Sequence, residues 1–138
     1  MLQLARNLRN YLNANKHVLN LPFIHGFPSN CCEISTLILA VAIRNNQLDN
    51  ASVRVVIGYD NENNESHFWL EVDSEFIDIT ADQFDSVNLP LYGGFNDFIV
   101  KKFSNVEKQS LDEFILQSDL LEVNQLVISQ VSSAIKAH

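Results

Sequence analysis

Two helical patterns of hydrophobic residues occupy the N-terminal part of the chain. The first predicts an amphipathic helix over residues 2–19 that covers one side of the domain. The second, from Ile34 to Ile43, is apolar on nearly every side, which is typical of a helix buried at the centre of a core. Pro22 and the 26–28 stretch interrupt the periodicity and predict a loop. The helical spacing of the first pattern is set by Leu2, Ala5, Leu8 and Leu12.

The expected start of the second helix carries both cysteines of the chain. Asn30 is a favourable N-cap residue, and Glu33 lies three positions later, as in a capping box. We therefore expect this helix to run from residue 31 to about Arg44, with Cys31 and Cys32 in its first turn.

After a predicted polar turn over residues 45–50, the pattern changes to one typical of strands. Asp73-Ser74 separates two alternating segments and predicts a two-residue hairpin, in which Val72 lies opposite Glu75. The polar, acidic stretch 60–65 predicts a solvated loop. Strands are expected over residues 53–57, 66–72 and 75–80.

The rest of the chain predicts mainly helix. Thr80 and Gln83 match a capping box and predict a short helical turn, and Gly93-Gly94 predicts a further turn. Residues 97–103 are expected to form another strand, and 110–137 a helix. Sequential strands joined by hairpins indicate an antiparallel sheet, so we expect an α+β fold, in one domain over residues 1–138.

Composition narrows the class of protein. The chain has 138 residues, is 46% hydrophobic and carries a net charge of −8, which suits one globular domain and disfavours nucleic acid as a partner. No segment predicts a membrane span or a signal peptide, so we expect a cytoplasmic protein without a membrane partner. Its oligomeric state is not predicted; part of the C-terminal helix is either core packing or a dimer interface.

One histidine is expected inside a strand. Side chains alternate along a strand, so His67 and Trp69 share a face. The predicted register places Trp69 opposite Asp78, which makes Asp78 a diagonal neighbour of His67. Asp78 lies among apolar residues and needs a buried partner. We therefore expect the carboxylate to hold one ring nitrogen of His67 and to leave the other free.

A thiol at the N-terminus of a helix completes a catalytic set. The helix dipole and the unpaired N–H groups favour a thiolate there, and an imidazolium nearby favours it further. The same N–H groups can stabilise the oxyanion of a tetrahedral intermediate. Cysteine, His67 and Asp78 together predict a site for acyl transfer, as nucleophile, general acid and base, and orienting carboxylate.

These residues resemble the papain-like and transglutaminase-like cysteine protease superfamily, in particular its small bacterial and phage-type members. The stretch from His67 to Val72, followed by Phe-Ile-Asp78, is similar to the H-x-W-x-E-V…D pattern of transglutaminase-like domains. The resemblance covers about residues 26–84, and it implies a central helix packed on an antiparallel sheet with flanking helices. In the family pattern the nucleophile stands two residues before an acid, which favours Cys31 over Cys32.

The resemblance leaves the oxyanion donor open. Papain-like relatives have a glutamine upstream of the cysteine, whereas this chain has His25 there. Asn30 is a second candidate, Cys32 is the alternative nucleophile, and Trp69 is expected to form a wall of the site.

The expected substrate is a peptide, a protein or a small amide or thioester, with water or an amine as the acyl acceptor. The alternative is a catalytically inactive binding or regulatory module on the same fold. We expect no cofactor and no metal. A zinc site at the cysteines, His25 and His67 is disfavoured because adjacent cysteines depart from the usual ligand spacing. The 60–65 loop lacks the spacing of a calcium-binding loop.

Overall fold

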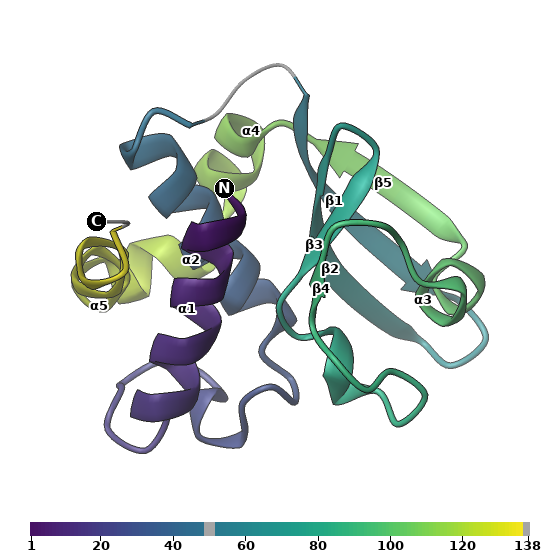
Figure 1. Cartoon of the computed structure of the whole chain (residues 1–138), viewed down its shortest axis with the longest axis horizontal. Coiled ribbons are helices and arrows are strands. Elements are labelled where there is room, and N and C mark those ends of the chain that lie inside the picture. Colours follow the sequence, from purple (N-terminus) through teal and green to yellow (C-terminus); the bar gives the residue numbers. More distant parts are fainter. Residues whose placement is uncertain (49–51, 137–138) are drawn as a thin grey trace.

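A computed structural model of the protein describes residues 1–48 and 52–136. The fold is α+β, as predicted: most of the helices lie on one side of an antiparallel sheet, and the short helix α3 lies on the other (Figure 1). The helices are α1 (Leu2–Asn15), α2 (Cys32–Asn45), α3 (Asp97–Lys102), α4 (Leu111–Gln117) and α5 (Asp119–Ala134), with 3₁₀ turns η1 (Ile24–Gly26) and η2 (Ala81–Gln83). The strands are β1 (Val53–Asp60), β2 (Glu65–Val72), β3 (Glu75–Asp78), β4 (Leu91–Tyr92) and β5 (Asn105–Gln109).

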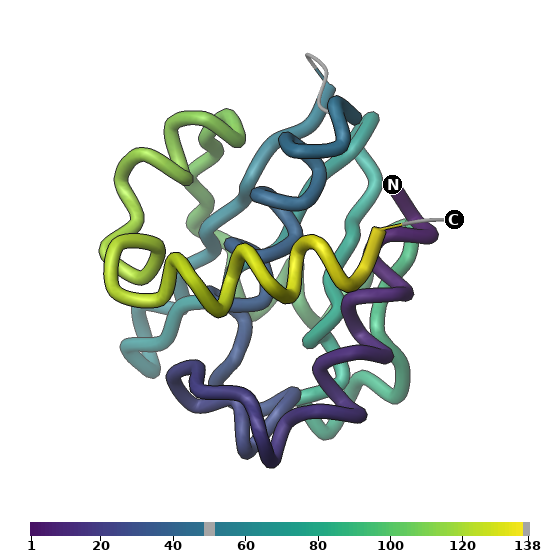
Figure 2. Tube along the Cα trace, turned by 90° about the vertical axis from the view of Figure 1, so that its left-hand side faces the viewer, coloured from purple at the N-terminus to yellow at the C-terminus, as the bar shows by residue number. Residues whose placement is uncertain are grey.

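Helix α2 is the centre of the helical layer. Every residue from Ile34 to Ile43 is buried, which confirms the prediction made from its apolar sequence. The helix contacts α1, α4, α5 and strand β2. Figure 2 shows α5 crossing in front of it, with α1 beside it. Because α2 is enclosed by neighbours along its length, the position of its N-terminus against the sheet is fixed by packing.

The sheet has the order β4-β3-β2-β1-β5, and all neighbouring strands are antiparallel. The predicted hairpin register is confirmed, since Val72 pairs with Glu75. Asp73 and Ser74 both have a left-handed backbone, with φ of 52° and 69°. Two consecutive positive φ values define the type I′ turn that suits the twist of a hairpin. This turn fixes which residues of β2 and β3 face each other.

The two faces of the sheet contribute to different clusters of buried side chains. The face toward α2 supplies the apolar residues Val53, Val55, Leu70 and Ile77. The opposite face supplies Val56, Trp69 and Phe76, which pack with Ile99 and Phe103 of the α3 segment. The rings of His67 and Trp69 are 5.5 Å apart, so His67 belongs to the face covered by α3.

Several predicted elements are wrong or differ in extent. Residues 97–103 were expected as a strand but form helix α3, because the Asn96 side chain accepts a hydrogen bond from the Ile99 amide and caps a helix there. Acidic Asp97 in its first turn and lysines in its last suit the helix dipole. Strands β4 and β5 were not predicted.

The expected helix over 110–137 is two helices, α4 and α5, separated by the extended backbone of Ser118. The first helix of the chain ends at Asn15 rather than at residue 19. Residues 49 and 50 of the predicted polar turn, and residue 137 of the last helix, lie outside the described residues. Among the described residues, no helix has the length and the apolar character that crossing a membrane requires.

Gly58 of β1 provides a test of this packing, because it lies opposite His67 in the sheet. A Cβ atom at Gly58 would lie 2.6 Å from the Phe103 Cβ and 2.7 Å from the Trp69 ring. We expect Gly58→Ala to lower the free energy of unfolding by about 1–3 kcal/mol, because neither neighbour can move without disturbing the α3 face of the sheet. Urea unfolding followed by circular dichroism measures the change.

Gly26→Ala is the matched control, since a Cβ atom at Gly26 meets nothing within 4 Å. Its effect should stay within about 0.5 kcal/mol, as for most surface substitutions. Equal stabilities of the two variants would contradict the described packing around Gly58.

Candidate active site

His67 and Asp78 form a buried pair between the central strand and its neighbour. The His67 Nε2 atom lies 2.6 Å from Asp78 Oδ2, and the two residues are 0% and 2% exposed. The other carboxylate oxygen, Oδ1, accepts hydrogen bonds from the backbone N–H of Thr80 at 3.2 Å and from its hydroxyl at 3.4 Å. Asp78 is thus held on both oxygens, at the point where β3 ends and the chain turns into η2.

Thr80 has a different role from the one that the sequence predicted. The short helical turn after it is present as η2, but the Thr80 side chain does not cap that turn. Its hydroxyl bonds to Asp78 instead, and the Gln83 amide bonds back to Thr80. The residues of the predicted capping box therefore support the carboxylate.

Aromatic rings enclose the imidazole of His67. Ring centroids of Trp69, Phe84 and Phe103 lie 5.5, 5.0 and 5.4 Å from the His67 ring, and the Phe84 ring meets it edge-on. Trp69 thus contacts the His67 ring, and its own Nε1 has no hydrogen-bond partner among the described residues. The apolar surroundings exclude water and strengthen the electrostatic attraction between His67 and Asp78.

The charge state of His67 is set by two opposing effects. Burial disfavours the imidazolium and lowers the pKa of His67, whereas the charge and the hydrogen bond of Asp78 raise it. Burial is the largest single effect, but the contributions of Asp78 and of the Cys32 thiol together outweigh it, so the pKa of His67 lies well above its ordinary value of 6.5. The raised pKa of His67 favours the imidazolium at neutral pH.

The two cysteines at the start of α2 have different surroundings. Cys31 is the N-cap residue and is buried, and its one S–H proton is shared between the backbone carbonyl oxygens of Phe23, 3.2 Å from Sγ, and Ser29, 3.1 Å from Sγ. Burial, together with the neighbouring Cys32, raises the pKa of the Cys31 thiol to about 11. Cys31 is thus a protonated thiol bound to the loop that precedes the helix.

Cys32 is the cysteine next to His67. It is the first residue of α2, it is half-buried, and its thiol acts on the His67 ring both as a hydrogen-bonding group and as a charge. Yet the His67 Nδ1 atom has no hydrogen bond of good geometry. A Cys32 sulfur that lies near the ring but is not aligned with Nδ1 accounts both for its effect on the pKa of His67 and for the missing hydrogen bond. Catalytic hydrogen bonds are often long before substrate binds.

The two candidate oxyanion donors are exposed, whereas His67 is buried. His25 is exposed on η1, and Asn30 is exposed with a left-handed backbone, φ 59°. Asn30 does not cap α2, which has Cys31 as its N-cap and no side-chain cap bond, so the predicted capping box with Glu33 is wrong. In residues 1–48 and 52–136, no three side chains of His, Cys, Asp or Glu converge as metal ligands.

Arg9 of α1 connects the segments on either side of the site, and sequence analysis missed it. Its guanidinium binds both carboxylate oxygens of Asp82, at 2.6 and 2.8 Å, and donates to the Ile79 carbonyl at 2.7 Å. It also lies over the Phe27 ring, 5.0 Å from the centroid. Arg9 thereby ties the turn after Asp78 to the loop before the cysteines.

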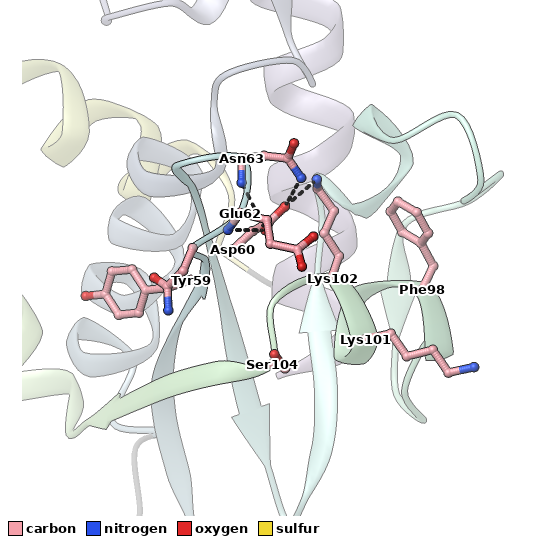
Figure 3. A pocket seen from close by; sticks show the side chains of 9 residues that line it. Tyr59, Asp60, Glu62, Asn63, Phe98, Lys101, Lys102 and Ser104 are labelled. Atoms are coloured by element: carbon pink, nitrogen blue, oxygen red, sulfur yellow. Dashed lines mark hydrogen bonds and ion pairs between the residues drawn. The ribbon is translucent and has the colours of Figure 1, made fainter.

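A hollow of about 400 Å³, lined by none of these residues, lies between the β1–β2 turn and α3 (Figure 3). Its acid Asp60 accepts hydrogen bonds from the Asn63 side chain at 2.7 Å and from Lys102 at 2.9 Å, which lower the pKa of Asp60 to about 2. Lys102 also lies 3.4 Å from Glu65. Asp60 and Lys102 are paired with each other inside this hollow, and neither His67 nor Cys32 lines it.

Comparisons of the chain with protein-family models, with curated proteins and with solved structures found no match. The functional argument therefore rests on the geometry of the site.

The charge state of His67 is testable by NMR. We expect the His67 ring to remain doubly protonated at about pH 7.5, where a histidine of ordinary pKa is mostly neutral. In Asp78→Asn the opposing charge is gone and burial dominates, so the ring should be neutral at the same pH. The ¹⁵N chemical shifts of the ring nitrogens measure this.

The raised pKa of His67 also makes the stability of the fold depend on pH. A raised pKa in the folded state means that the stabilisation from this pair is complete below the unfolded value of about 6.5 and is lost as the pH rises through the folded value. A His67 ring that is neutral at about pH 7.5 in the unchanged protein would contradict the ion pair.

Proposed function

We propose that this protein is a cysteine-dependent acyl-transfer enzyme in which Cys32 is the nucleophile, His67 the general acid and base, and Asp78 the orienting carboxylate. The observation that carries the proposal is that the two ring nitrogens of His67 have different surroundings. Asp78 holds Nε2, while Nδ1 is buried without a bonded acceptor and has the Cys32 thiol beside it. The family resemblance favoured Cys31 as the nucleophile, and we propose Cys32 in its place.

The reaction follows from these three groups. The proton of the Cys32 thiol resides on His67, and the thiolate attacks a substrate carbonyl to form a C–S bond. When the tetrahedral intermediate collapses, His67 returns its proton to the departing amine or thiol. His67 then takes a proton from water or from an amine as that acceptor attacks the thioester carbon. The C–S bond breaks, the acyl product leaves, and the Cys32 thiolate beside protonated His67 is regenerated.

The negative oxygen of the tetrahedral intermediate needs donors, and the first turn of α2 can supply them. The first backbone N–H groups of a helix have no partner within the helix. No side chain caps these groups in α2. This supports the backbone, rather than exposed His25 or Asn30, as the source of oxyanion stabilisation.

The substrate class we propose is a peptide, a protein or a small amide or thioester, and the resemblance to papain-like and transglutaminase-like enzymes is consistent with it. A binding module without turnover is the second candidate. The burial of His67 and Asp78, at 0% and 2% exposure, favours that candidate, because substrate must reach the site through Cys32 alone.

Thiol reactivity distinguishes these functions. At about pH 6.5 an ordinary thiol is about 1% ionised, whereas a thiolate paired with an imidazolium is mostly ionised. After allowance for the weaker nucleophilicity of a stabilised thiolate, we expect iodoacetamide to modify Cys32 about tenfold faster than a free thiol. His67→Gln should remove this advantage. Mass spectrometry of the modified peptide measures the rate at each cysteine.

A pair of matched variants locates the nucleophile. Cys32→Ser should abolish the rapid reaction, whereas Cys31→Ser should retain it, because a serine hydroxyl can still donate to the carbonyls that Cys31 binds. The reverse result would return the nucleophile to Cys31. Ordinary reactivity of both thiols in the unchanged protein would favour the binding module.

A further inference from the structure

A small hollow adjoins the first turn of α2. It has a volume of about 110 Å³ and is formed by the loop before α2, by the first turn of α2 and by the start of α5. A water molecule occupies about 30 Å³ in the liquid, so the hollow has room for one amino-acid side chain and not for a folded partner. Its lining residues are Pro22, Phe23, Asn30, Glu33, Ile34 and Leu120.

The hollow lies next to the proposed nucleophile. Asn30 and Glu33 line it, and these two residues flank the cysteines in the chain. Ile34 belongs to the same turn of α2 as Cys32. The hollow and the Cys32 backbone therefore belong to the same turn of α2, although Cys32 itself does not line the hollow.

The chemistry of the hollow combines apolar walls with one acid. Pro22, Phe23, Ile34 and Leu120 are apolar, and no basic residue lines it. The half-buried Glu33 carboxylate forms no ion pair or hydrogen bond among the described residues. Burial, followed by the charge of Asp119, raises the pKa of Glu33, so both effects disfavour the carboxylate until a cation is near.

Several half-buried or buried acids of the described residues have a basic partner. Asp82 pairs with Arg9, Asp60 with Lys102, and Glu71 with Lys108. Glu33 lines the hollow, the charge of Asp119 acts on it, and neither acid has such a partner in the described part of the chain. This charge pattern is complementary to a positively charged group from outside.

The rim of the hollow indicates a peptide rather than a free small molecule. The Phe23 side chain is 72% exposed. Val123, one turn after Leu120 on α5, is 84% exposed. Exposed apolar side chains beside a pocket are typical of surfaces that contact a larger partner.

We infer that this hollow is a specificity subsite that holds a lysine or arginine side chain of a peptide substrate, next to the acyl group that is transferred to Cys32. The aliphatic stem packs on Phe23 and Leu120, and the cationic end meets Glu33. The inference rests on the proposed function, since it assigns a substrate preference to the same site.

Two affinity labels test the subsite. Nα-acetyl-lysine chloromethyl ketone and its norleucine analogue have side chains of similar length, and both alkylate a thiolate with loss of chloride. We expect the lysine label to modify Cys32 about tenfold faster, as a charge-assisted hydrogen bond predicts. The preference should decrease at high salt. In Glu33→Gln the ratio of the two rates should fall to about one.

Glu122→Gln is the matched control, because it removes the same charge from an exposed position of α5 that does not line the hollow. It should retain the preference for the lysine label. Equal rates of the two labels in the unchanged protein, or a preference that survives Glu33→Gln, would overturn the subsite even if Cys32 reacts rapidly.

A second measurement does not depend on a reactive thiol. On titration with Nα-acetyl-lysine methylamide, the backbone amide signals of Glu33 and Leu120 should shift, and with the norleucine amide they should not. If neither label modifies Cys32 rapidly, the proposed function fails, and this titration alone decides the subsite. Absence of a lysine-specific shift overturns it.

Discussion

The buried contact between His67 and Asp78 is the constraint on which the rest of the site depends. Removing a charge from water costs several kcal/mol even after the protein relaxes, so an ion pair at 2.6 Å persists only when its geometry is held. Thr80 holds the free carboxylate oxygen of Asp78 with two hydrogen bonds. Loss of one partner would leave an uncompensated charge, which costs about 3–5 kcal/mol in other proteins.

The fold meets this constraint through features that have no role in chemistry. The type I′ turn at Asp73-Ser74 sets the register that brings β3 beside His67. Gly58 leaves the space on the opposite strand that the Trp69 and Phe103 rings require. Apolar residues of similar volume would often give equal stability at such a place. Stability alone therefore does not require a buried histidine and aspartate there, which supports the chemical role proposed for the pair.

Sequence reasoning succeeded where local signals decide the structure. The turn residues and the alternation of β2 and β3 determine a register, and the register determines that His67 and Asp78 are neighbours. It failed at residues 97–103, because a short apolar run is ambiguous between strand and helix until its cap is considered. Arg9 and Asp82 are 73 residues apart, and no local pattern relates them. Their contact depends on how α1 packs against the sheet, which periodicity alone does not specify.

The two cysteines show that a difference of one position at the start of a helix changes the surroundings of a side chain completely. The sequence locates such a start only to within a residue or two, and consecutive side chains of a helix diverge by about 100°. Cys31 has the non-helical backbone of an N-cap, and its one S–H proton is shared between two carbonyl oxygens. A thiolate has no proton to donate and would be repelled by both oxygens, so this position keeps Cys31 protonated. Cys32, one residue later, is half-buried and lies beside the His67 ring instead. The same helix end thus holds one thiol bound to the preceding loop and one that faces the buried histidine.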